Sequence, residues 1–386
     1  MKIQSAKIIL CCTVMLFAVS IILFFYSNRK YRDSVQHIKS SVKGISEIKS
    51  MNNGTKWTRC FRTADGTIYF KDHKMSRDQG RTILDQKSID VEELNRVPER
   101  AFLATDKLFY ALNGRTEFVS QGIYKGKAWR SDNKLTSLKE EEPIFIIPEG
   151  IKPRKDVERW FGIFVYRTIL TMPDGSWLMT MYGNFEPDTI VPNDKDAFLE
   201  TQFMARTIIM TSTDEGHSWK YLSTVAAPQR GEPVGEGFVE PAITLLRDGR
   251  LLCIMRAGHH FPLYASWSSD NGKTWSPPVY TGLDRGCDPC LITLSDGRVA
   301  LSWGRRYTEG WSIISTVGDQ ERFKYPGEGY TNLAISNDGG LTWDNNKIMS
   351  QSGSCYSTIF EAEPNVIFMQ VDQWFCRIAL TKPRNY

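Results

Sequence analysis

The sequence predicts an all-β protein, a six-bladed β-propeller that follows an N-terminal transmembrane helix. Three observations predict this fold: an octapeptide that occurs three times, a series of Asp-Gly turns, and one long apolar stretch near the N-terminus. The 386 residues, 12% of them aromatic, are enough to bury a large core. Because the octapeptide repeats, one domain built from repeats is favoured over several unrelated domains.

The octapeptide reads Ser-x-Asp-x-Gly-x-Ser/Thr-Trp. Its copies occupy residues 212–219, 268–275 and 336–343. They begin 268 − 212 = 56 and 336 − 268 = 68 residues apart, as in a repeat with variable insertions. The Asp side chain can hydrogen-bond to its own turn, the Gly supplies a positive φ, and the Trp ring can cover the apolar side of the turn. Each copy therefore predicts a β-hairpin turn.

Asp-Gly pairs mark further hairpins, because each is followed by a β-prone run. They lie at residues 65–66, 174–175, 248–249 and 296–297. No comparable helical periodicity follows residue 60. Short strands with recurring turns over the rest of the chain are typical of a propeller with four strands per blade. At about 50 to 60 residues per blade, the prediction is six blades.

The apolar stretch runs from Ile8 to Tyr26, with only Thr13 and Ser20 as polar members. It is long enough to cross ~30 Å of hydrocarbon as a helix. A membrane anchor is favoured over a cleaved signal peptide, since no small-x-small cleavage site follows. The short N-terminus is expected inside and the propeller outside the cell, in the periplasm or in a lumen. The predicted tail, anchor, stem and propeller span residues 1–7, 8–26, 27–53 and 54–386.

Charge and cysteine content limit the possible partners. A net charge of +4 is compatible with an anionic ligand and too weak to indicate nucleic acid. Six cysteines outside the apolar stretch permit disulfides without establishing any. Cys287 and Cys290 have the spacing of half a zinc ribbon, but no second such pair exists. We therefore predict neither a metal site nor a cofactor.

The three octapeptides resemble the Asp-box repeats of the sialidase superfamily, and residues 159–356 are similar to the body of a sialidase-like six-bladed propeller. Asp boxes also occur in binding proteins and in other glycosidases, so function has to be argued from the site.

The strongest site signal combines Glu240, Pro241 and an Asp-Gly hairpin with Arg256, which follows Glu240 by 256 − 240 = 16 residues. Antiparallel return of the strand is expected to bring Glu240 and Arg256 to the same end of one blade. The resemblance implies that Glu240 assists the nucleophile and that Arg256 is one of three arginines that bind a substrate carboxylate.

The resemblance also implies the other two arginines. Arg167 follows an aromatic residue before an Asp-Gly hairpin and matches the first arginine, with Arg62 as a rival. Arg305, in a Gly-Arg pair at the end of a strand, matches the third, with Arg322 as an alternative. Planar guanidinium groups suit this role because they bind carboxylates through two parallel hydrogen bonds.

The catalytic candidates come from two further segments. Tyr356, 356 − 336 = 20 residues after the start of the last octapeptide, lies in a Tyr-Ser context similar to that of the sialidase nucleophile. The resemblance implies an acid/base Asp about 15 residues before the first octapeptide, where Asp196 and Asp194 both qualify and Asp196 is preferred. A neutral tyrosine hydroxyl can approach a sugar whose anomeric carbon carries a carboxylate, and Glu240 can accept its proton.

These residues predict an exo-glycosidase of sialidase type that cleaves terminal sialic acid or a related acidic sugar from glycans, with retention of configuration. Two alternatives stay open. One is a glycosidase or lyase for another acidic sugar, such as a uronic acid. The other is a non-catalytic glycan-binding propeller. Residues 67 to 158 indicate no chemistry of their own.

Overall fold

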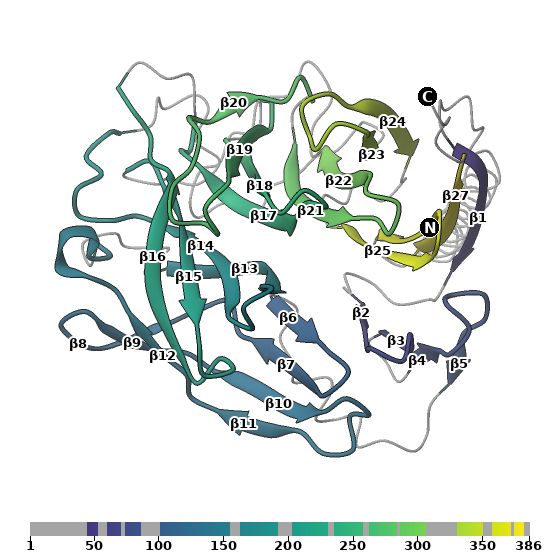
Figure 1. The fold of residues 1–386 in the computed structure, drawn as a ribbon, viewed down its shortest axis with the longest axis horizontal. Coiled ribbons are helices and arrows are strands. Elements are labelled where there is room, and N and C mark those ends of the chain that lie inside the picture. The colour runs from purple at the N-terminus through teal and green to yellow at the C-terminus, as the bar shows by residue number, and fades with distance from the viewer. Residues whose placement is uncertain are drawn as a thin grey trace, which may run out of the picture. The chain divides into compact units, whose positions relative to one another are not determined.

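The computed structural model describes residues 45–52, 60–70, 74–85, 101–154, 163–191, 203–230, 235–257, 262–283, 286–305, 330–349, 357–371 and 374–381. All of them belong to one compact unit, residues 42–386. They form β-strands and one short 3-10 helix, η1 (Glu149–Ile151), which confirms the all-β prediction (Figure 1). In these ranges no helix has the length and apolar character needed to cross a bilayer. The anchor predicted over 8–26 lies outside the described residues.

Four sheets have four antiparallel strands each. We call them groups A, D, E and F. Group A holds β2 (Phe61–Arg62), β3 (Ile68–Phe70), β4 (Lys74–Ser76) and β5 (Leu84–Asp85). Group D holds β17 (Val239–Leu245), β18 (Leu251–Arg256), β19 (Tyr264–Ser268) and β20 (Val279–Tyr280). Group E holds β21 (Cys287–Thr293), β22 (Val299–Arg305), β23 (Tyr330–Ser336) and β24 (Asp344–Met349). Group F holds β25 (Ser357–Glu363), β26 (Val366–Val371), β27 (Trp374–Leu380) and β1 (Ile45–Asn52).

The fifth sheet has eleven strands and contains two further groups. Group B holds β6 (Ala101–Ala104), β7 (Leu108–Leu112), β10 (Ala128–Asp132) and β11 (Lys139–Glu141). Group C holds β13 (Ile163–Thr171), β14 (Trp177–Gly183), β15 (Arg206–Ser212) and β16 (Ser218–Ala226). Parallel pairing of β6 with β13 joins B to C. Beyond β16 the sheet continues through β12 (Ile144–Ile146), β9 (Ile123–Lys125) and β8 (Glu117–Ser120).

Group F is completed from the far end of the sequence, because β1 pairs with β27 along its length. β1 lies inside segment 27–53, which the sequence predicts as a stem. The last part of that segment is therefore a strand of the sheet, where its backbone N–H and C=O groups find partners in β27.

Apolar clusters lie between successive groups. One cluster contains Phe109 of B and Tyr69 of A, a second Leu178 of C and Ile243 of D, and a third Leu252 of D and Leu301 of E. Ile68 of group A packs in one cluster with Phe368 of group F. The first strands also follow one another side by side, in the order β6, β13, β17, β21 and β25 (Figure 1).

The four Asp-Gly pairs connect the first strand of a group to its second, in groups A, C, D and E. The three octapeptides connect the third strand to the fourth, in groups C, D and E. In the first copy Gly216 N–H donates to Ser212 Oγ at 2.8 Å, and Ser218 N–H donates to Asp214 Oδ1 at 2.9 Å. The predicted hairpin turns are confirmed.

The same turn closes group A, where Gly80 N–H donates to Ser76 Oγ at 2.8 Å and Thr82 N–H donates to Asp78 Oδ1 at 2.8 Å. Ile83 takes the place of the Trp. A variant of this turn closes group B, where Thr136 N–H and Oγ1–H donate to Asp132 at 2.9 and 2.5 Å. Five of the six groups thus share one turn between their last two strands.

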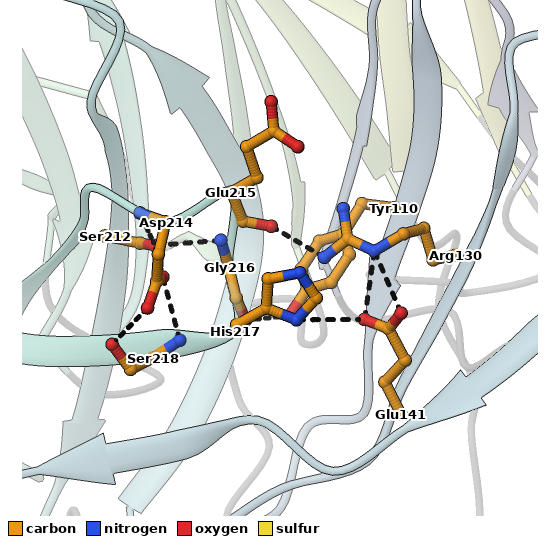
Figure 2. Close-up of polar contacts among 9 residues, drawn as sticks. All are labelled: Tyr110, Arg130, Glu141, Ser212, Asp214, Glu215, Gly216, His217 and Ser218. Carbon is orange, nitrogen blue, oxygen red and sulfur yellow. Dashed lines mark hydrogen bonds and ion pairs between the residues drawn. The ribbon is translucent and has the colours of Figure 1, made fainter.

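Figure 2 shows how the turn of group C is fastened to group B. Tyr110 Oη donates to Gly216 O at 2.8 Å, and Arg130 Nη2 donates to Glu215 O at 2.7 Å. Glu141 accepts from Arg130 Nε at 2.9 Å and lies 3.7 Å from His217 Nδ1. Tyr110 and Arg130 thus donate hydrogen bonds to backbone carbonyls of the turn, which would otherwise need water as a donor.

Candidate active site

Three first strands carry the same irregularity. The pairing register shifts between Tyr166 and Ile169 in β13, between Val239 and Ala242 in β17, and between Cys287 and Cys290 in β21. Each bulge contains one non-glycine residue with positive φ: Arg167 at 61°, Glu240 at 47° and Asp288 at 52°. A bulge redirects a side chain, and this backbone conformation costs about 1–3 kcal/mol per residue. Three equivalent bulges thus present three charged side chains.

Arg167 and Asp288 form a buried ion pair. Arg167 Nη2 contacts Asp288 Oδ2, and Nε donates to Oδ1 at 3.2 Å. The Asp288 side chain has no solvent exposure, and that of Arg167 has 5%. Tyr166 Oη also donates to Asp288 Oδ1. Three donors therefore hold the Asp288 carboxylate in place, as a buried charge requires, because it is stable only when paired and hydrogen-bonded.

Arg256, at the end of β18, lies between two carboxylates. Its Nη1 is 2.8 Å from Glu240 Oε1, and its Nη2 is 2.8 Å from Glu236 Oε2. Burial alone would lower the pKa of Arg256, but the charges of Glu236 and Glu240 outweigh it and raise that pKa well above its ordinary value. Contact between Glu240 and Arg256 is what antiparallel return of the strand predicts.

One hydrogen bond joins these two ion pairs. The backbone N–H of Asp288 donates to Glu240 Oε2 at 2.7 Å. The chain of contacts runs from Arg167 through Asp288 and Glu240 to Arg256 and Glu236. It contains two cations and three carboxylates, a formal charge of 2 − 3 = −1. Both arginines already have a carboxylate of the protein beside them.

The other candidates are described only in part. Ser357, which follows Tyr356 in the sequence, accepts a hydrogen bond through its carbonyl from Arg167 Nη2 at 2.5 Å. Arg305 ends β22 and pairs with Tyr330 across the sheet. Outside the described residues lie four candidates: Tyr356, Asp194, Asp196 and Arg322.

Arg62, the rival to Arg167, does not join this network. It ends β2 and lines a pocket whose wall also includes Arg167. Cys287 and Cys290 are buried, with thiols that donate weakly to the carbonyls of Gly304 and Ile359. Over the described ranges, no three His, Cys, Asp or Glu side chains gather as metal ligands.

Asp288, Glu236 and Tyr166 also belong to the network, although the sequence did not predict a role for them. A signal for Asp288 exists: it is followed by Pro289 and precedes an Asp-Gly turn by 296 − 288 = 8 residues. Glu240 likewise is followed by a proline and precedes its turn by 248 − 240 = 8 residues. Glu236 and Tyr166 carry no comparable pattern.

A comparison with protein families matches residues 152–369, more than half of the chain, to the BNR repeat-like domain. The chain belongs to this family. The match covers groups C, D and E, with their Asp boxes and the charged network, and it confirms the resemblance to the sialidase and BNR-repeat superfamily. No curated protein matches the sequence of this BNR repeat-like protein.

Solved structures with a similar fold include a protein of unknown function from Dyadobacter fermentans. It has a TM-score of 0.56 and 14% identity, over 89% of this chain and 100% of that one. A second is the Hadza microbial sialidase Hz136, with a TM-score of 0.51 and 14% identity. That match covers 84% of this BNR repeat-like protein and 65% of the sialidase, just under two thirds. At such identities the likeness concerns the fold.

Proposed function

We propose that the six four-stranded groups are the blades of a six-bladed propeller and that this protein is an exo-glycosidase of sialidase type. Five first strands in succession, a shared turn in five groups and packing of group F against group A support the propeller. Completion of group F by β1 supports it too, because a strand from the N-terminal part of the chain pairs with β27 near the C-terminus, as expected for the closing blade of a propeller.

The observation that carries the enzymatic proposal is the fixed carboxylate of Glu240. It is held by Arg256 Nη1 at 2.8 Å and by the N–H of Asp288 at 2.7 Å. Hydrogen bonds from two such donors favour the charged form of a carboxylate and fix its orientation. A general base requires both. The bulge in β17 gives Glu240 its direction at a cost in backbone energy, as is typical of functional positions.

In the proposed reaction, Tyr356 attacks the anomeric carbon of a terminal acidic sugar while Glu240 accepts the phenolic proton. Asp196, or Asp194, donates a proton to the departing glycosidic oxygen. A water molecule then hydrolyses the tyrosyl-linked sugar, so that the configuration is retained. The bond from Arg167 to the carbonyl of Ser357 brings the start of β25, the strand that follows Tyr356 in the sequence, to this cluster.

Arg167, Arg256 and Arg305 are the proposed ligands of the sugar carboxylate. A guanidinium group carries five N–H donors, enough to serve one carboxylate of the protein and another of the ligand. Asp288 and Glu236 would then orient Arg167 and Arg256, and would leave other N–H donors of these arginines for the substrate carboxylate. The class of ligand is accordingly a terminal sialic acid or a related acidic sugar on a glycan.

A second candidate is a glycosidase or lyase for a uronic acid, because arginines bind the carboxylate of that sugar in the same way. A non-catalytic glycan-binding propeller would need only part of the network.

We also propose that residues 8–26 anchor the protein in a membrane, with the propeller outside the cell, in the periplasm or in a lumen.

The test is hydrolysis of a fluorogenic α-sialoside and of a fluorogenic β-glucuronide by the full chain in detergent, beside Arg256→Ala. The matched control is Arg250→Ala, which removes an exposed arginine paired with Asp248 in the same group. Release from the sialoside alone, lost in Arg256→Ala and kept in Arg250→Ala, supports the proposal. Release from the glucuronide alone favours the second candidate, and equal rates for both variants would exclude Arg256 from the site.

A further inference from the structure

A pocket of about 310 Å³ lies among the first strands, apart from the Glu240–Arg256 pair. Its walls come from β2, β6, β13, β21 and β25 and the residues next to them. Most of the lining is apolar, as at Phe102, Ile169, Leu291 and Phe360. This size suits a small ligand. The polyhydroxylated sugar of the proposed reaction does not match such walls, which indicates a ligand of another class.

Arg62 is the unusual member of the lining. Across the described part of the chain it has no ion pair, and its buried Nε has no hydrogen-bond acceptor. Its guanidinium lies over the ring of Phe360, 5.8 Å from the ring centre. Burial lowers the pKa of Arg62, while the charges of Asp65 and Glu361 partly oppose that shift. A guanidinium never loses its proton under ordinary conditions, so the pocket contains a fixed positive charge.

The two nearby carboxylates have other partners. Asp65 accepts from Thr63 Oγ1 at 2.7 Å and from Thr67 N–H at 3.0 Å. Glu361 accepts from Ser295, through N–H at 2.7 Å and through Oγ at 2.9 Å. A ligand anion could therefore approach Arg62 without breaking an existing ion pair. Arg167, the other cation of the wall, is held by Asp288.

We propose that this pocket binds a small organic anion with an apolar body, whose charged head contacts Arg62. The head gains a charge-assisted hydrogen bond in a site of low polarity, where such bonds are strong. The body buries its apolar surface against the walls. The pocket shares Arg167 with the proposed substrate site, but neither Glu240 nor Arg256 lines it, and Arg62 has no part in the proposed reaction.

The test is calorimetric titration of the full chain in detergent with octanoate and with its neutral analogue octanamide. Both ligands are kept at concentrations too low to disturb the detergent micelles. We expect octanoate to bind at least about tenfold more tightly than octanamide. Arg62→Gln should abolish this difference. The matched control, Arg77→Gln, removes an exposed arginine of the same group A. This variant should still bind octanoate more tightly than octanamide.

A second variant, Ala104→Phe, fills the pocket without a change in charge and should weaken both ligands. Two results would overturn the proposal. One is no octanoate binding to the folded wild type. The other is an unchanged preference for octanoate in Arg62→Gln. Since binding is measured without turnover, neither result bears on hydrolysis of a sialoside.

Discussion

Asp288 donates its backbone N–H to the Glu240 carboxylate at 2.7 Å, while its own side chain pairs with Arg167. One residue thus couples two charged side chains from other strands. Asp288 lies in the β21 bulge with φ 52°, and from there its N–H meets Glu240 of β17 while its carboxylate meets Arg167 of β13.

Asp288→Asn tests this coupling. The change leaves the Arg167 charge buried without its anion, so we expect the free energy of unfolding to fall by about 3–5 kcal/mol. Chemical denaturation measures it. Asp248→Asn is the matched control, because the Asp248–Arg250 pair is exposed and should contribute less than about 1 kcal/mol. Equal losses in the two variants would contradict a special role for Asp288.

Gly216→Ala tests the fastening of the Asp-box turn in Figure 2. Gly216 has φ +87°, and an added Cβ would lie 2.9 Å from the rings of Trp177 and Tyr110. Gly175→Ala is the control, since Gly175 has φ +85° and no atoms within 4 Å of an added Cβ. Both variants incur the backbone strain, so the crowded site should lose about 1–3 kcal/mol more in thermal or chemical unfolding.

The Asp boxes also predict acid sensitivity. Hydrogen bonds from the Thr274 hydroxyl and backbone N–H lower the pKa of Asp270 to about 2. A carboxyl whose pKa is lower in the folded state stabilises the fold above its unfolded pKa of ~4. This contribution disappears as the pH falls toward 2. The melting temperature of Thr274→Val should lie below that of the wild type at pH 6 and approach it at pH 2. A difference that stays constant with pH would contradict this assignment.

Local turn chemistry made much of the fold predictable. Three octapeptides and four Asp-Gly pairs identify the first and third strand connections of groups C, D and E, and the first connection of group A. The turns at Asp78 and Asp132 escape the pattern, because Ile83 replaces the Trp in one and Lys134 replaces the Gly in the other. Their hydrogen bonds nevertheless keep the same form, since these depend on the Asp and on the hydroxyl four residues later.

The candidate site was predictable only where its partners share a hairpin. Glu240 and Arg256 meet because β17 and β18 are consecutive antiparallel strands. Arg167 and Asp288 are 121 residues apart and lie in different groups, so their contact arises from packing between groups. Neither pattern nor spacing encodes that packing.

Glu240 and Tyr356 are the residues that we propose carry out retaining hydrolysis of an acidic sugar. The most direct test is the rate of α-sialoside hydrolysis by the full-length wild type, by Tyr356→Phe and by Glu240→Gln, each shown to be folded. We predict release by the wild type and a loss of at least about a hundredfold in kcat for each variant. No release by the folded wild type, or variants as fast as the wild type, would contradict the claim.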